Sequence, residues 1–450
     1  MGARVQARDL AEVKRGLSAP LTAAVAVAFA DSSIVVLALP ELYGRFDTTI
    51  EGVSWVVTAY NLAVAVTALA LVLLVHRLDT RSVLAAGLGL FLAASIACAA
   101  AQSLGFLIGA RSVQGVGAAL LLAAALPVLG ARRWTAASTF GLAVGPALGG
   151  VLTQAFDWRA IFIAQAPVAA FGLVAVVRAR EQVSAEEGWL GSLTRTLPAN
   201  ACLGLVFGAL VGALFLAVLL VISVWGYSPI GGALLVSSLP VAALAARPLE
   251  RRLEPSVAVC GGAALLALGL IGLALLPSAS AALAVWALLL CGAGLGLAVP
   301  VLSNATLNRG AGLARSGTLT VGARHLGLVL ALALIAPLLA SRVPAAGDRA
   351  LLRGTAVLLD APVGLDKKVP VALDLRSAFA RAQAGETPDL AQPFNAHGAR
   401  HDSSLAAARD KLAGAIEATI TRASRPAFFL CASFAALALL LAAVYRRRLS

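Results

Sequence analysis

The sequence predicts an all-α polytopic membrane protein with twelve transmembrane helices in two six-helix lobes. Of its 450 residues, 60% are hydrophobic and only 13% are charged, whereas soluble domains average about 45–50% apolar and about 25% charged residues. Twelve apolar runs each approach the roughly 20 residues that a helix needs to cross a bilayer. A polar segment at 179–198 divides these runs six and six.

The spans are expected to be helical because lipid offers no hydrogen-bond partner to the backbone. They lie at about 19–40, 53–75, 82–101, 104–128, 134–155, 159–178, 199–224, 230–247, 256–276, 280–303, 319–341 and 426–445. The predicted parts are a tail at 1–18, an N-terminal lobe at 19–178, a linker at 179–198, a C-terminal lobe at 199–341 and 426–445, and a tail at 446–450.

The distribution of Lys and Arg sets the expected orientation. With the N-terminus inside, the two tails and the inner loops hold 19 basic residues, and the short outer loops hold only Arg45 and Arg159. Positive charge accumulates on cytoplasmic loops. We therefore expect a multi-pass protein of the cell membrane with both termini in the cytoplasm. This bias accounts for most of the net charge of +13 without nucleic acid as a partner.

The segment 342–425, between the last two spans, is predicted to be an extracytoplasmic loop domain. It holds 12 basic and nine acidic residues, and long loops are exempt from the charge bias. Helical pieces are expected at about 372–384 and 402–423, separated by a Gly- and Pro-containing loop at 385–400. Two roles remain open for this domain: a solvated or membrane-surface cap, and a part in substrate handover.

Asp31 lies near the middle of the first run and is the one carboxylate well inside a predicted span. A carboxylate at such a depth costs at least ~2.5–3.5 kcal/mol on insertion scales, so it marks a functional site by default. Arg111 is the costliest residue of the fourth span and needs a partner. A nearby cation favours the ionised carboxylate and burial disfavours it, so Arg111 beside Asp31 would tune that acid.

Three motifs carry a family resemblance. They are Asp31-x-Ser33-Ile-Val-x-x-Ala-Leu-Pro40 in span 1, Arg111-x-x-Gln114-Gly115-x-Gly117 in span 4, and Gly141-x-x-x-Gly145-Pro146-x-x-Gly149-Gly150 in span 5. This set resembles the major facilitator superfamily, and within it the drug:proton antiporters of the fourteen-span subfamily. Only about 20 polar residues link the two halves here, so the two extra helices of that subfamily are missing and the major facilitator fold is expected with twelve spans.

The resemblance implies proton coupling by Asp31 and Arg111, with a static tether between the two helices as the alternative. It also implies a substrate cavity between the lobes. The residues expected to line it are Asp31, Ser33, Tyr60, Asn61, Gln114 and Gln165. Val36 stands where the family has Asn, which removes one polar group from the cavity wall.

The span-5 motif is expected to serve gating and helix packing through Gly141, Gly145, Pro146, Gly149 and Gly150. The first, second and fourth of these follow at i, i+4 and i+8, which makes one smooth helix face. Pro146 removes a backbone hydrogen bond and permits a bend. Ordinary tight packing is the alternative reading.

The latch between spans 2 and 3 departs from the family pattern, and Arg324 of span 11 is a charged residue whose position in the membrane has to be interpreted. The cytoplasmic latch between spans 2 and 3 reads His76-Arg77-Leu-Asp79-Thr-Arg81 and lacks the glycines of the family; either the latch is weakened or Asp79 replaces it from a shifted position. In span 11, Arg324 lies about one turn from the end, and we expect it to snorkel toward the membrane surface.

These observations predict a proton-coupled exporter that acts by alternating access on small, amphipathic or lipophilic and in part cationic molecules. The alternative is a lipid or lipid-conjugate exporter that uses the 342–425 loop, and a membrane sensor or scaffold that transports nothing is the third. No phosphate-binding loop, HExxH pair or nucleophile elbow occurs, which argues against an enzyme. We expect no cofactor or metal beyond the proton gradient, protons and membrane lipid as partners, and a monomer.

Overall fold

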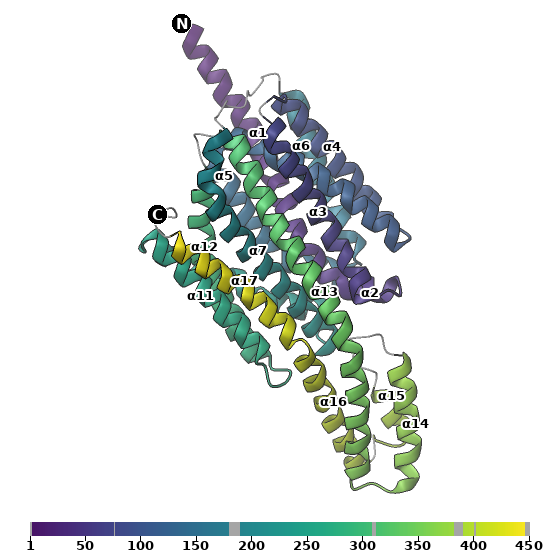
Figure 1. Cartoon of the computed structure of the whole chain (residues 1–450). Coiled ribbons are helices and arrows are strands. Elements are labelled where there is room, and N and C mark those ends of the chain that lie inside the picture. The colour runs from purple at the N-terminus through teal and green to yellow at the C-terminus, as the bar shows by residue number, and fades with distance from the viewer. Residues whose placement is uncertain are drawn as a thin grey trace.

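The computed structural model describes residues 2–75, 77–179, 190–307, 312–381, 390–399 and 402–445, and all the regular elements in this part of the chain are helices. The helices form an elongated bundle, shown in Figure 1. The N- and C-termini lie toward the same end of the bundle, and α14, α15 and α16 extend from the other end. This arrangement is the predicted all-α membrane fold.

The N-terminal lobe contains the following elements: α1 (Gly2–Ile34), η1 (Val35–Ala38), α2 (Leu39–Arg45), α3 (Ile50–Leu74), α4 (Thr80–Ala99), α5 (Leu104–Ala155) and α6 (Arg159–Arg178). The sequence predicts one continuous helix to residue 40 for the first span. The span is instead interrupted by a 3-10 turn at η1, which separates α1 from α2. Pro40 explains the interruption, since it has no N–H to donate to the carbonyl of Val36.

Two predicted spans lie within α5, which is 52 residues long. Gly130 separates them with a φ of 73°, a conformation that glycine adopts without a steric penalty. Within the described residues, 11 helical stretches are long and apolar enough to cross a membrane. Because the stretch at Leu104–Ala155 holds two spans, these stretches correspond to the twelve that the sequence predicts.

The linker ends in a short 3-10 helix, η2 (Leu190–Thr196), and the C-terminal lobe follows. Its elements are α7 (Leu197–Val218), η3 (Leu219–Val224), α8 (Pro229–Val236), α9 (Ser238–Ala245), α10 (Arg247–Glu250), α11 (Pro255–Ala274), α12 (Ala281–Thr306), α13 (Leu313–Asp360) and α17 (Arg425–Val444). The eighth span is therefore built from three short helices. The lobes pack along α3 with α13 and along α5 with α8.

The segment 342–425 is largely helical. α13 continues to Asp360, well beyond the predicted end of its span at 341, and is followed by α14 (Leu365–Arg381), α15 (Ala391–Ala396) and α16 (Ser403–Ala423). The expected loop at 385–400 thus contains α15, and residues 385–389 and 400 lie outside the described residues. α16 packs along the extension of α13. Buried apolar side chains hold these helices together: Val371, Leu375, Phe394, Leu405 and Leu412.

Candidate functional site

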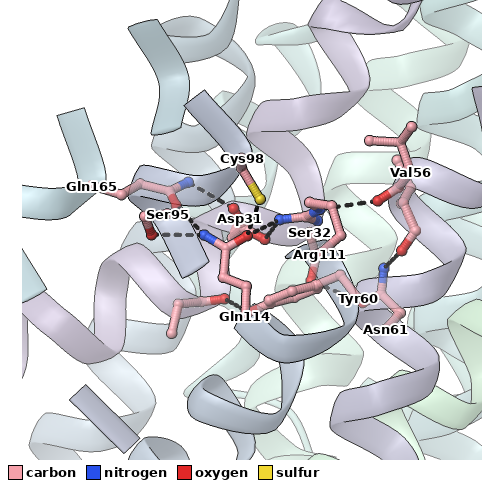
Figure 2. Close-up of polar contacts among 12 residues, drawn as sticks. Asp31, Ser32, Val56, Tyr60, Asn61, Ser95, Cys98, Arg111, Gln114 and Gln165 are labelled. Carbon is pink, nitrogen blue, oxygen red and sulfur yellow. Dashed lines mark hydrogen bonds and ion pairs between the residues drawn. The ribbon is translucent and has the colours of Figure 1, made fainter. Parts of the chain in front are cut away.

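A fully buried ion pair lies at the centre of the N-terminal lobe. Arg111 of α5 donates from Nη1 to Oδ2 of Asp31 on α1, and neither side chain is exposed. Gln165 of α6 donates from Nε2 to Oδ1 of the same carboxylate at 2.6 Å. Both carboxylate oxygens are therefore occupied by protein donors (Figure 2). The structure brings together the two residues predicted to act in proton coupling.

The guanidinium of Arg111 is also tied to α3. Its Nε donates to the carbonyl of Val56 at 2.9 Å, and its Cζ lies 4.3 Å from the centre of the Tyr60 ring. Tyr60 in turn donates its hydroxyl to the carbonyl of Ala28 on α1 at 2.8 Å. The aromatic face and the carbonyl stabilise a cation that has left water. Arg111 Nη2 has no hydrogen-bond partner among the described residues.

Amide side chains extend the network to α4 and α6. Gln114 accepts from Arg111 at 2.6 Å and donates to Gln165 at 2.7 Å and to the Ser95 hydroxyl at 2.9 Å. The Cys98 thiol lies 3.8 Å from the Gln114 oxygen. Ser95 and Cys98 are not among the site residues predicted from the sequence. Ser95 was a detectable signal, because it is a polar residue deep in an otherwise apolar span.

A second polar chain crosses between the lobes. Asn61 on α3 accepts through Oδ1 from the Ser32 hydroxyl at 3.0 Å, and the same oxygen lies 2.7 Å from Nδ1 of His325 on α13. Because the amide NH₂ of Asn61 is used by the Val57 carbonyl, the oxygen is an acceptor here and His325 Nδ1 carries the proton. This chain joins α1, next to Asp31, to the C-terminal lobe.

The glycines of span 5 determine how closely the helices approach. A Cβ on Gly141 would meet the carbonyl oxygen of Ala26, and one on Gly149 would meet that of Ile34. A Cβ on Gly145 would meet the Ser33 hydroxyl. These three therefore let α1 lie directly on α5. Gly150 faces the other lobe, where a Cβ would meet Ala233 of α8.

An apolar cavity of about 80 Å³ lies between the lobes. Its walls come from α1, α5, α7, α9, α10 and α12, and Ser33 and Pro146 are the predicted residues among them. Asp31, Tyr60, Asn61, Gln114 and Gln165 do not line it, and all five are buried, 0–3% exposed. The cavity wall and the polar network are therefore adjacent. Ser33 lies in the wall, and the neighbouring Ser32 belongs to the network.

Arg324 does not snorkel as expected. It is 2% exposed and donates to the hydroxyls of Ser138 at 2.9 Å and Ser303 at 2.7 Å. Three aromatic rings surround its guanidinium, and these partners from other helices hold it inside the bundle.

The sequence model of the Major Facilitator Superfamily matches residues 21–333. The chain belongs to the major facilitator superfamily. It is accordingly a membrane transporter and not an enzyme.

Curated relatives of this superfamily match part of the chain. The drug efflux pump JefA of Mycobacterium tuberculosis is 32% identical over 189 residues, which cover 38% of this chain and 37% of that protein. The multidrug resistance protein Stp of the same organism is 34% identical over 157 residues, 32% of this chain and 29% of its own. The methylenomycin A resistance protein of Bacillus subtilis is 31% identical over 165 residues, covering 34% and 35%. The chain thus spans about a third of the length of these relatives.

Solved structures of the superfamily share the fold over 70% to 97% of the chain. An inward-facing bacterial homologue of the human lysosomal transporter Spinster gives a TM-score of 0.65 at 14% identity and covers 97% of this chain and 98% of its own. The D-xylose–proton symporter gives a TM-score of 0.58 at 14% identity, with 70% and 88% covered.

The superfamily's latch position is occupied differently here. Asp79 caps α4 by accepting from the backbone N–H and the hydroxyl of Ser82, both from within its own turn. These hydrogen bonds from Ser82 lower the pKa of the Asp79 carboxyl. Arg81 donates to the carbonyl of Val177 at the end of α6, and His76 lies outside the described residues. Asp79 thus serves as a helix cap, and no ion pair joins it to Arg77 or Arg81 in the described structure.

Proposed function

We propose that this protein exports amphipathic or lipophilic small molecules in exchange for protons, by alternating access of the cavity between its lobes. The buried Asp31–Arg111 pair carries this proposal, because Asp31 lies on α1 two residues before Ser33, which lines that cavity. The match of the chain to drug efflux pumps over about a third of its length supports the export direction.

The chemistry of the pair favours a proton switch. Both oxygens of Asp31 accept hydrogen bonds from Arg111 and Gln165, which stabilises the ionised form. A proton on Asp31 would leave the buried Arg111 without its counter-charge, and an uncompensated buried charge costs several kcal/mol. The protonated protein would therefore favour another arrangement of α1, α5 and α6.

Helix packing can transmit such a change to the cavity. Ser33 lies two residues after Asp31 on α1. It lines the cavity, and its hydroxyl lies against Gly145 of α5. Movement of α1 along the glycine face would thus reshape the wall formed by Ser33 and Pro146. One carboxylate in this position corresponds to about one proton per cycle.

Everted membrane vesicles with an imposed pH gradient test this function. Three fluorescent probes would be used: neutral N-phenyl-1-naphthylamine, anionic 1-anilinonaphthalene-8-sulfonate and cationic ethidium. We expect gradient-driven uptake of at least one probe by the wild type and its loss in Asp31→Asn. The exposed carboxylate variant Asp410→Asn is the matched control and should transport normally. Unchanged uptake by Asp31→Asn would remove this residue from the mechanism.

Export of a lipid or lipid conjugate is the second candidate. A small cavity of about 30 Å³ lies between the lobes toward the α14–α16 end, and Ile420 and Ser424 contribute to its wall beside Tyr43 and Leu339. The segment 342–425 therefore touches the space through which a substrate would leave in that direction.

A deletion separates the two candidates. Asp360 and Ser403 line one shared hollow, so α13 can be joined to α16 by a short Gly/Ser linker after removal of residues 361–401. If the protein exports lipids, vesicles with the deletion variant should lose transport of a fluorescently labelled phospholipid and keep transport of the dyes. If both activities survive the deletion, this candidate is wrong.

A further inference from the structure

A cluster of hydrogen-bond donors lies at the contact between the lobes. Arg324 on α13 donates from Nη1 to Ser138 on α5 and from Nη2 to Ser303 on α12. We call these three residues the donor cluster. All three are at most 2% exposed. They join both lobes deep inside the molecule.

The donor cluster has no negative charge to balance it. Within the described residues, no carboxylate lies within ion-pair distance of Arg324, whereas Arg111, equally buried, is paired with Asp31. The rings of Phe207, Phe29 and Trp134 lie 4.8, 5.7 and 5.7 Å from the Arg324 guanidinium. Ring faces stabilise a cation only in part, and a buried cation without a counter-ion remains costly.

The cluster also lacks acceptors. Arg324 Nε has no hydrogen-bond partner in the described structure. The hydroxyls of Ser138 and Ser303 each accept from Arg324, and among the described residues neither donates to an acceptor. A hydroxyl retains one O–H to donate after it has accepted. Arg324 Nε and the two hydroxyls are thus three buried donors for which the described residues supply no acceptor.

The donor cluster adjoins the apolar cavity. Ser138 and Phe207, which both contact Arg324, belong to its wall. The rest of that wall is mostly Leu, Val, Ala and Pro. An apolar body of a molecule in the cavity would therefore lie beside the Ser138 hydroxyl, and Arg324 and Ser303 lie behind that hydroxyl, outside the wall. This combination fits an amphiphile whose polar end is an anionic oxygen group.

We propose that Arg324, Ser138 and Ser303 bind the anionic group of the transported molecule, a sulfonate, carboxylate or phosphate on an apolar body. The inference rests on the proposed export function. It narrows the amphipathic substrates of that proposal to anionic ones, whereas the sequence suggested in-part cationic compounds. A bound anionic group would balance the charge of Arg324. It would thereby contact the C-terminal lobe through Arg324 and Ser303 and the N-terminal lobe through Ser138.

Equilibrium binding to the full chain in lipid nanodiscs tests the proposal. The probes are 1-anilinonaphthalene-8-sulfonate and N-phenyl-1-naphthylamine, which share the same ring system and differ by the sulfonate. Empty nanodiscs supply the background for partition into lipid. Charged hydrogen bonds are typically worth about 1.5–3 kcal/mol, so the wild type should bind the sulfonate at least about tenfold more tightly than the neutral probe.

The variants locate that preference. Arg324→Gln should remove it and leave affinity for the neutral probe within about twofold, whereas Arg324→Lys should retain part of it. Arg349→Gln removes an exposed charge from the same helix and should bind both probes as the wild type does. Ser138→Ala should weaken only the sulfonate, by a few-fold, and it decides the question if Arg324→Gln does not fold.

Equal affinity of the wild type for the two probes would overturn the proposal, as would a sulfonate preference that survives in Arg324→Gln or, if that variant does not fold, in Ser138→Ala. The assay uses no proton gradient. Failure of anion binding is therefore distinguishable from failure of proton-coupled export, which Asp31→Asn tests in energised vesicles.

Discussion

At the scale of single residues, two buried arginines differ in what surrounds them. Arg111 contacts a carboxylate, a carbonyl, an amide and a ring face. Among the described residues, the partners of Arg324 are hydroxyls and rings. Arg111 therefore belongs to a charge-balanced ion pair, and a proton on Asp31 would remove that balance. Arg324 belongs to an open set of donors. The same residue type thus supports two roles because the partners differ.

The Asp31–Arg111 pair should behave as one unit in stability. Arg111→Gln alone leaves a buried carboxylate unpaired and should destabilise the protein by about 3–5 kcal/mol. Asp31→Asn with Arg111→Gln removes both charges and should unfold at a temperature nearer the wild type than either single variant. Thermal unfolding followed by tryptophan fluorescence in detergent measures this. Additive effects of the two substitutions would show that the residues are not coupled.

A second prediction at this scale concerns Asp402, which caps α16 and pairs with Lys367 at 2.8 Å. Hydrogen bonds from Lys367 and from the backbone N–H of Leu405 lower the pKa of Asp402 from 3.8. Because the folded pKa is the lower one, the stabilisation is present above pH 3.8 and disappears as the pH falls through the folded value.

The protection factor of the amides in the first turn of α16, which corrects for the pH dependence of intrinsic exchange, should therefore stay high from neutral pH to about 4 and fall only below it. Asp402→Ala should show fast exchange there throughout this range, and the middle of α16 serves as the internal reference. Loss of protection in the wild type between pH 5 and 6 would contradict the assignment.

At the scale of elements, the contact of α1 with α5 is the one on which the site depends. Gly141, Gly145 and Gly149 bring the two backbones together, and the ion pair joins the same two helices. Small residues at helix contacts permit such close approach in membranes. The sequence pattern predicted the smooth face. That α1 covers it is visible only in the structure.

Gly149→Ala tests this contact. The added methyl group meets the backbone carbonyl of Ile34, which cannot rotate away, so α1 must shift at a cost of about 1–3 kcal/mol. We expect a lower melting temperature and at least fivefold slower dye transport. Gly109→Ala, in the same helix but facing open space, is the control and should leave transport unchanged. Equal transport by the two variants would show that close packing at the glycine face is not required for transport.

At the scale of the whole molecule, the sequence predicted the fold well because lipid imposes simple rules. Long apolar runs have to be helices, and the motifs of three spans resemble one superfamily. The break at Pro40 and the length of α13 were not predicted, because apolar length alone does not locate helix ends.

The site was only partly predictable. Asp31 and Arg111 stood out since charges are rare in apolar runs, and the structure brings them together. The burial of Arg324 was missed because its partners come from helices distant in the sequence. The cavity was assigned too many polar residues for a related reason: a polar side chain in a span can face its own lobe instead of the space between the lobes.

The measurement that tests proton coupling most directly is the proton flux driven by a dye gradient. Proteoliposomes without a pH gradient would contain a pH indicator and receive whichever of the three probes the vesicle assay shows to be transported. The wild type should move about one proton against each dye molecule. Asp31→Asn should still exchange the dye while the protons moved per dye fall at least tenfold. A proton-to-dye ratio equal to that of the wild type in Asp31→Asn would contradict the account.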